Sequence, residues 1–184
     1  MKKLKVTELN RITVEAFKDA HKLPLTMVLD DIRSLHNVGS VFRTADAFRI
    51  ERIMLCGITA QPPMPEIHKT ALGAEDSVSW QFIPDAVEAV EALKVQGYTV
   101  LAVEQVVGSE KLDKITFDPT KKYAFVMGNE VKGVQQSVVD VCHGSLEIPQ
   151  YGTKHSLNVS VTAGIVMWEF CKQVAATSFI PEKR

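Results

Sequence analysis

The sequence predicts an α/β fold in which a mostly parallel β-sheet is flanked by helices. Short apolar runs, typical of strands buried on both faces, alternate with segments of helical period. Repetition of strand, helix and strand favours parallel pairing. No internal repeat or low-complexity linker divides the 184 residues, a length that suits one domain with its own core.

The first element expected is a helix over residues 7–22, because apolar residues recur along one side: Leu9, Ile12, Phe17 and Ala20. This helix either packs on the core or contacts substrate. Six strands should follow, at Met27–Leu29, Arg52–Leu55, Ser79–Phe82, Thr99–Val103, Tyr123–Met127 and Ser145–Ile148. Helical spacing predicts helices over residues 38–48, 86–93 and 134–141, with irregular connections at residues 62–65 and 108–119.

The last predicted helix differs from an ordinary surface helix. Its apolar residues cover most of the circumference: Val159, Val161, Ile165, Val166, Met167, Trp168, Phe170, Cys171 and Val174. A surface helix shows one apolar stripe, so we expect this helix to be buried on several sides. Its polar residues gather at the start, where the loop and first turn offer hydroxyl, amide and backbone donors to a ligand.

Composition and charge exclude several classes of protein. A net charge of −1 provides no global field for nucleic acid, so any basic footprint must be local. The cysteines, Cys56, Cys142 and Cys171, lack the spacing of a metal site and are interpreted as free thiols in a reducing compartment. No apolar run approaches a membrane span and no signal peptide is evident, so we expect a cytoplasmic protein without a membrane partner.

Ligands of open parallel sheets bind beyond the carboxyl ends of the strands. Three polar clusters fall at such ends: Asp30–Arg43, Gly128–Gly133 and Gln150–Asn158. We therefore expect these segments to converge at one edge of the sheet.

In the first cluster, Asn37 can cap a helix whose apolar stripe begins at Val38. Gly39 permits close approach of a backbone or a phosphate, and the forked guanidinium of Arg43 suits a phosphate. The alternative is that Asn37 is only a cap and Arg43 a partner in a surface ion pair.

In the second cluster, Glu130 stands between two glycines and could accept from ribose hydroxyls or from the amides of its own turn. Alternatively, it is an acid that favours a helix N-terminus. No Gly-x-Gly-x-x-Gly follows a strand and no P-loop is present, which disfavours a dinucleotide enzyme or a P-loop ATPase.

In the third cluster, Ser156 and Asn158 lie at the start of the last helix and follow Lys154 and His155. His155 is interpreted as a solvated loop residue, as is His36. No Gly-x-Ser-x-Gly elbow surrounds Ser156, so capping and ligand orientation suit it better than nucleophilic attack.

Taken in order, Asn37 to Arg43, then Met127-Gly-Asn-Glu130, then Ile148-Pro-Gln with Ser156-Leu-Asn-Val-Ser-Val161, the chain closely resembles the SpoU/TrmH branch of the SPOUT RNA methyltransferases. The resemblance runs from about residue 24 to residue 172. It implies an α/β domain with a C-terminal deep trefoil knot, a homodimer, and transfer of a methyl group from S-adenosylmethionine to a ribose 2'-hydroxyl of tRNA or rRNA, without a metal. The expected organisation is an N-terminal helical extension (1–23), a SPOUT methyltransferase domain (24–176) and a C-terminal tail (177–184).

The resemblance also implies roles for particular residues. The family's catalytic motif residues fall on Arg43, Asn37, Glu130, Ser156 and Asn158, and its cofactor contacts fall on Val103, Gly128, Ile148, Ser156 and Leu157. Arg43 would clamp an RNA phosphate, and whether it also accepts the proton stays open, because a guanidinium does not normally deprotonate. Related enzymes often carry an N-terminal RNA-binding domain or long basic terminal helices. Only about two dozen residues precede the expected core here, which leaves substrate selection unexplained.

Two other classes of protein remain alternatives. One is a non-catalytic RNA-binding or assembly factor that retains the fold. The other is a small-molecule enzyme on a flavodoxin-like sheet, which would need a phosphate cradle that the sequence does not contain.

Overall fold

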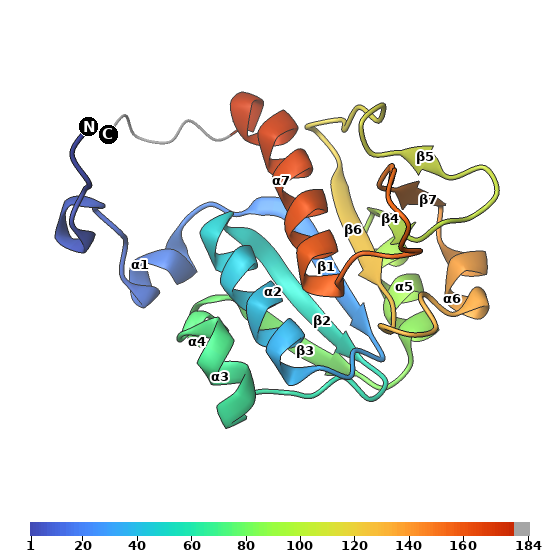
Figure 1. Ribbon diagram of the computed structural model, residues 1–184, viewed down its shortest axis with the longest axis horizontal. Helices are drawn as coiled ribbons and strands as arrows, with labels where there is room; N and C mark the ends of the chain where they lie inside the picture. The colour runs from blue at the N-terminus through green and yellow to red at the C-terminus, as the bar shows by residue number, and fades with distance from the viewer. Residues whose placement is uncertain (179–184) are drawn as a thin grey trace.

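A computed structural model describes residues 1–178 and contains one seven-stranded sheet in the order β3-β2-β1-β6-β4-β7-β5. Every adjacent pair of strands in this sheet is parallel (Figure 1). The strands are β1 (Leu23–Asp30), β2 (Ile50–Cys56), β3 (Ser79–Ile83), β4 (Tyr98–Val103), β5 (Glu110–Lys111), β6 (Lys122–Met127) and β7 (Gly144–Glu147).

Helices cover both faces of the sheet (Figure 1). The described residues form the helices η1 (Val6–Glu8), α1 (Val14–Asp19), α2 (Leu35–Ala47), α3 (Pro65–Ala71), α4 (Ala74–Ser77), α5 (Ala86–Val95), α6 (Gln136–Val141) and α7 (Val159–Ser178), of which η1 and α1 lie to the side of the sheet. One apolar cluster packs α2, α3 and α7 on one face, and a second packs α5 and α6 on the other. Successive residues of β1 alternate between them: Met27 and Leu29 belong to the first and Val28 to the second.

The α/β prediction is confirmed, and all six expected strands are present with ends shifted by a few residues. Three elements were not predicted. The strand β5 has only two residues. The helices α3 and α4 begin within or after a proline-rich stretch that was interpreted as an irregular connection. Pro65 occupies the first turn of α3, where its missing N–H costs no hydrogen bond.

The prediction of one helix over residues 7–22 is wrong. The chain forms the short η1, an extended stretch, and then α1, whose N-cap Thr13 accepts from the Ala16 N–H at 3.2 Å. Asn10 has a positive φ of 48°, which a helix does not allow. Of the four residues proposed as the apolar face, only Phe17 is buried.

The prediction that α7 is buried on several sides is also wrong for the single chain. One side packs in the core through Ala163, Val166 and Phe170, all at 0% exposure. The opposite side leaves Val161 51% and Trp168 54% exposed. An apolar stripe therefore faces outward; it consists of Leu157, Val161, Ile165 and Trp168 and is called the α7 stripe below.

The helix α7 runs through residues 177 and 178, the first two of the predicted C-terminal tail. The rest of that tail, residues 179–184, lies outside the described residues.

Candidate functional site

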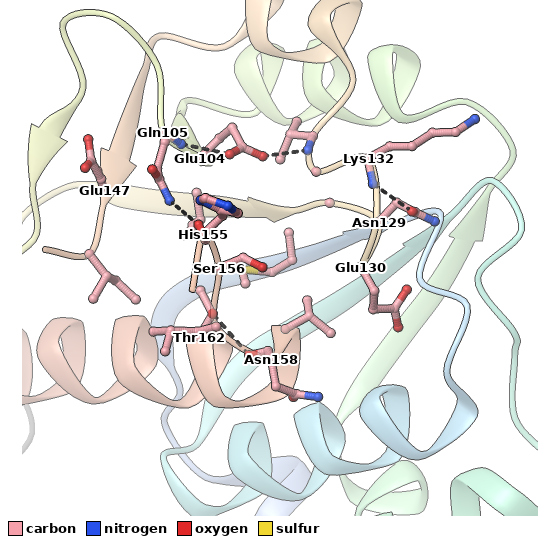
Figure 2. A pocket seen from close by; sticks show the side chains of 18 of the residues that line it. Glu104, Gln105, Asn129, Glu130, Lys132, Glu147, His155, Ser156, Asn158 and Thr162 are labelled. Carbon is pink, nitrogen blue, oxygen red and sulfur yellow. Dashed lines mark hydrogen bonds between the residues drawn. The ribbon is translucent and has the colours of Figure 1, made fainter. Parts of the chain in front are cut away.

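A pocket of about 570 Å³ lies at the carboxyl ends of β4, β6 and β7 (Figure 2). It is lined by residues from three segments, 103–105, 127–134 and 146–159, and by Thr162. The second and third predicted clusters therefore converge as expected, and the first contacts them through side chains described below.

The pocket contains most of the predicted site residues. Seven line it directly: Glu130, Ser156, Asn158, Val103, Gly128, Ile148 and Leu157. Asn37 and Arg43 do not. At Gly128, an added Cβ would lie 2.2 Å from Val134 N, so a side chain here would collide with the main chain of the pocket's floor.

Glu130 links the pocket to the first turn of α2. Its carboxylate accepts from the backbone N–H groups of Arg33 (2.9 Å) and Ser34 (3.0 Å) and from the Asn37 side-chain amide (3.0 Å). Burial pushes the pKa of Glu130 upward, but these hydrogen bonds outweigh it, so the pKa lies below its ordinary value. One alternative raised for Glu130, an acid at a helix N-terminus, is therefore confirmed, and the helix is α2; acceptance from a ribose hydroxyl stays a prediction.

The prediction that Asn37 caps α2 is wrong. The helix begins earlier, at Leu35, and Ser34 is its N-cap, with Oγ accepting from the Asn37 N–H at 3.3 Å. Ser and Asn are equally good caps, and Glu130, which accepts from the backbone N–H groups of Arg33 and Ser34, favours a start at Ser34. Asn37 lies in the first turn, 9% exposed, and its side chain is free to connect other segments.

Asn158 completes this connection. Its Nδ2 donates to Asn37 Oδ1 at 3.2 Å, and its Oδ1 accepts from the Ser160 N–H at 2.9 Å and the Ser160 hydroxyl at 2.6 Å. Asn158, rather than Ser156, therefore caps α7. Figure 2 shows Glu130 and Asn158 directed toward α2, while Lys132 extends away from them.

Two residues that the sequence reasoning missed shape the other wall. Glu104 accepts from the Val134 N–H at 2.9 Å, and its carboxylate occupies the space that a Cβ on Gly133 would need. Gln105 donates from Nε2 to the His155 carbonyl at 2.8 Å. Both residues directly follow β4, so the rule that led to the three clusters could also have found them.

Arg43 lies exposed on α2, beyond the turn that carries Asn37. Among residues 1–178, it has no hydrogen bond or ion pair. The alternative of a surface ion-pair partner therefore has no support in the described part of the chain, and the guanidinium is available to an anion.

Gly39 permits the close approach that was predicted, and the neighbour is a backbone. An added Cβ would lie 2.3 Å from the Ile67 carbonyl oxygen and 2.2 Å from Thr70 Oγ1, both on α3. Gly39 therefore serves the packing of α2 on α3.

The cysteines are free in the structure. Burial raises the pKa of Cys56 to about 12 and that of Cys142 to about 11. Neither thiol is therefore a thiolate nucleophile at neutral pH.

The described residues contain neither a metal-binding cluster nor a membrane-spanning helix. In residues 1–178, no group of three or more His, Cys, Asp or Glu is placed to hold a metal ion. In the same part of the chain, no helix has the length and apolar character needed to cross a bilayer.

The pocket fits an adenosyl-type ligand. Its walls carry apolar side chains, namely Val103, Met127, Leu146, Ile148, Leu157 and Val159, beside main-chain groups of two loops. Flat apolar walls suit a purine ring, and a few fixed polar groups orient it. A parallel sheet with such a pocket at its carboxyl edge is typical of proteins that bind a nucleotide-type ligand there.

Comparison with known proteins identifies the family. Residues 24–168 match the model of the SpoU rRNA Methylase family, and the chain belongs to this family. The resemblance inferred from the three motifs is confirmed.

Individual relatives are distant. The chain is 32% identical over 170 residues to the 23S rRNA (guanosine-2'-O-)-methyltransferase RlmB of Nitrosomonas europaea, covering 91% of this chain but 64% of the relative. It is 29% identical over 167 residues to a tRNA (guanosine(18)-2'-O)-methyltransferase of Thermus thermophilus, covering 91% of this chain and 84% of the relative.

Solved structures agree on the fold. An AdoMet-bound rRNA methyltransferase from Sinorhizobium meliloti superposes with a TM-score of 0.75 at 26% identity, over 85% of this chain and 59% of that one. A TrmH/SpoU tRNA modifying enzyme from A. aeolicus gives a TM-score of 0.79 at 23% identity, over 90% and 84% of the two chains.

Proposed function

We propose that this protein is an S-adenosylmethionine-dependent RNA methyltransferase that acts on a ribose 2'-hydroxyl of tRNA or rRNA. The observation that carries the proposal is the chain of side-chain hydrogen bonds from Glu130 through Asn37 to Asn158, which joins all three sequence clusters beside one pocket. The family membership and the names of the relatives support the same activity.

S-adenosylmethionine would be held by Val103, Gly128, Ile148, Ser156 and Leu157, all of which line the pocket. When bound, it supplies a methyl group already activated by the adjacent sulfonium. The protein's task is then alignment and removal of one proton. No metal takes part in this proposal.

Arg43 would bind an RNA phosphate. Its guanidinium is exposed and lies on the helix whose first turn is fixed by Glu130, and a forked donor matches a phosphate. Asn37 and Glu130 would fix the position of α2, and therefore of Arg43, relative to the pocket. Ser156 and Asn158 would shape the loop around the methyl donor.

The wider organisation is part of the proposal. Residues 24–176 would form the SPOUT methyltransferase domain, with a deep trefoil knot where the segment before α7 passes the loops after β4 and β6. Residues 1–23 would be an N-terminal extension. The protein would act in the cytoplasm, where tRNA and rRNA are found.

A homodimer accounts for the α7 stripe. Three apolar side chains on one side of α7, together with Leu157 just before it and with Trp168 54% exposed, are costly to leave in water. A second copy packed on this stripe would cover them, and Leu157 belongs to both the stripe and the pocket.

The test measures methyl incorporation from labelled S-adenosylmethionine into total RNA from cells lacking the protein. We expect incorporation at a 2'-oxygen, mapped as a 2'-O-methyl nucleotide, and none into DNA of the same sequence as the identified RNA. A protein that binds the donor and the RNA but transfers nothing would instead be the non-catalytic factor, and methylation of the deoxy substrate would contradict ribose chemistry.

A further inference from the structure

The segment 149–157, which joins β7 to α7, forms one wall of the pocket through Gln150, His155, Ser156 and Leu157. Residues 151–157 of this segment are all exposed. Tyr151 does not line the pocket itself, and 95% of its surface is accessible.

The tyrosine ring has no partner in the described chain. It makes no aromatic or cation-π contact with residues 1–178, and its hydroxyl makes no hydrogen bond there. Within that part of the chain, the segment is held by one hydrogen bond, from Gln105 Nε2 to the His155 carbonyl. Both faces of the ring are therefore open, on a segment whose residues Gln150 and His155 line the pocket.

The charge around the ring suits a nucleic acid. Lys154 and His155 are exposed on the same segment, which contains no acidic residue. The three carboxylates of the pocket lining are already engaged: Glu104 accepts from the Val134 N–H, Glu147 pairs with Lys111, and Glu130 accepts from the start of α2. An exposed aromatic ring and an unpaired lysine on one segment are the combination by which proteins bind unpaired nucleotides.

We propose that Tyr151 stacks on a nucleobase of the RNA substrate next to the ribose that is methylated, while Lys154 contacts the adjoining phosphate. The inference rests on the proposed function, because it requires RNA at the mouth of this pocket. It makes Tyr151 a substrate-binding residue that selects unpaired RNA. Stacking tolerates every base, so Tyr151 contributes affinity for an exposed nucleotide rather than a sequence code.

A second copy of the chain is the other possible cover for the ring. Lysine is depleted in protein interfaces, and three of the four side chains of the α7 stripe, the apolar surface available for a dimer, lie on α7 and not on this segment. The RNA interpretation is therefore the better supported by charge.

The experiment compares Tyr151→Phe, Tyr151→Leu and Tyr151→Ala with the wild type, and uses Val95→Ala, an 88% exposed residue on α5, as the matched surface control. Initial rates are measured against the concentration of total RNA from cells lacking the protein, at saturating S-adenosylmethionine. Donor affinity is measured by calorimetry, and the oligomeric state by sedimentation. All four variants change exposed side chains, so folding should be unaffected.

We expect Tyr151→Ala to raise the KM for RNA about fivefold to about 150-fold, the range for loss of one stacked base. Tyr151→Phe should remain within twofold of the wild type, Tyr151→Leu should lie between Phe and Ala, and donor affinity should not change. The stacking role alone would be overturned by an unchanged KM in Tyr151→Ala or by full activity in Tyr151→Leu. A change in the sedimentation mass of a Tyr151 variant would overturn it as well. A wild-type protein that transfers no methyl group to RNA would overturn the proposed function, and the stacking role with it.

Discussion

The side-chain amide of Asn37 donates to Glu130 Oε1 at 3.0 Å, although the two residues are 93 positions apart in the chain. The same carboxylate accepts from two backbone N–H groups at the start of α2. Three donors converge on one ionised group, which lowers its pKa despite burial. The charge on Glu130 therefore fixes α2 against the pocket.

Glu130→Gln tests this arrangement. An amide keeps one acceptor oxygen but loses the charge, so we expect the free energy of unfolding at pH 7 to fall by about 1 kcal/mol. Because the folded-state pKa of Glu130 is lowered, its contribution is complete above the ordinary carboxyl pKa and is lost as pH falls through the folded value. Urea unfolding at pH 7 and at pH 3.5 checks both statements, with the exposed Glu110→Gln as control. An equal loss at both pH values would mean that the charge is not involved.

Asn158 has two functions that different substitutions can separate. Asn158→Asp retains the oxygen that caps α7 but can no longer donate to Asn37, whereas Asn158→Ala removes both interactions. We expect Ala to cost about 1 kcal/mol of stability. The Asp variant should stay within about 0.5 kcal/mol of the wild type and yet lose transfer activity, because it adds a second carboxylate beside Glu130. Full activity in the Asp variant would show that the link to Asn37 is dispensable.

How much of the fold the sequence predicted depends on the strength of each local signal. Strands such as β6 are short, continuous apolar runs that indicate a buried strand, and their predicted positions are confirmed. The predicted N-terminal helix is too long. Its apolar spacing is loose, and Thr13, which is a good N-cap, starts a shorter helix inside it. The exposed side of α7 could not be inferred from its composition, because composition does not tell which apolar residues of a helix face the core and which face solvent.

The site was predictable where a residue acts next to its own strand. Gly128 and Glu130 follow β6 directly, and their place at the carboxyl edge required only the rule for parallel sheets. The partners of Glu130 on α2 were not predictable, since a contact across 93 to 97 residues depends on strand order. In the folded sheet, β6 pairs with β1 and not with β3, and this strand order brings Glu130 to α2.

Arg43→Ala should slow methyl transfer strongly without weakening the binding of the methyl donor. The guanidinium does not line the pocket, so we expect donor affinity within twofold of the wild type and a transfer rate lower by about 100-fold, the cost of losing one charged donor. Arg43→Lys should recover only part of the rate, because an ammonium lacks the forked geometry. Calorimetry with S-adenosylmethionine and single-turnover methylation provide the two readings. Loss of donor affinity in the Ala variant would contradict this division of labour.

Ile165→Glu tests the dimer through the α7 stripe. Glutamate favours a helix but places a charge among Val161 and Trp168, so we expect the variant to sediment as a monomer. Val95→Glu, on the exposed side of α5, is the matched control and should remain dimeric. If Ile165→Glu keeps the mass of the wild-type dimer at micromolar concentration, the interface lies elsewhere.

Asp30 should make the protein less stable as pH rises. It is 2% exposed at the end of β1, and burial, followed by repulsion from Asp31 and Asp85, raises its pKa to about 6, although Gln135 donates to it. The folded state therefore holds a proton that the unfolded chain releases near pH 4, and the free energy of unfolding should fall between about pH 4 and about pH 6. At about 1.4 kcal/mol per pKa unit, the loss is at most about 3 kcal/mol.

Asp30→Asn removes this titration and keeps an acceptor for Gln135. We expect the variant to be more stable than the wild type at pH 8 and equally stable at pH 3.5, as measured by urea unfolding at both values. Asp113→Asn, in an exposed pair with Lys114, is the control and should change stability little at either pH. If Asp30→Asn destabilises the protein at pH 8, the charged carboxylate is required by its neighbours Asp31, Asp85, Cys56 and Gln135, and the sign of the argument is reversed.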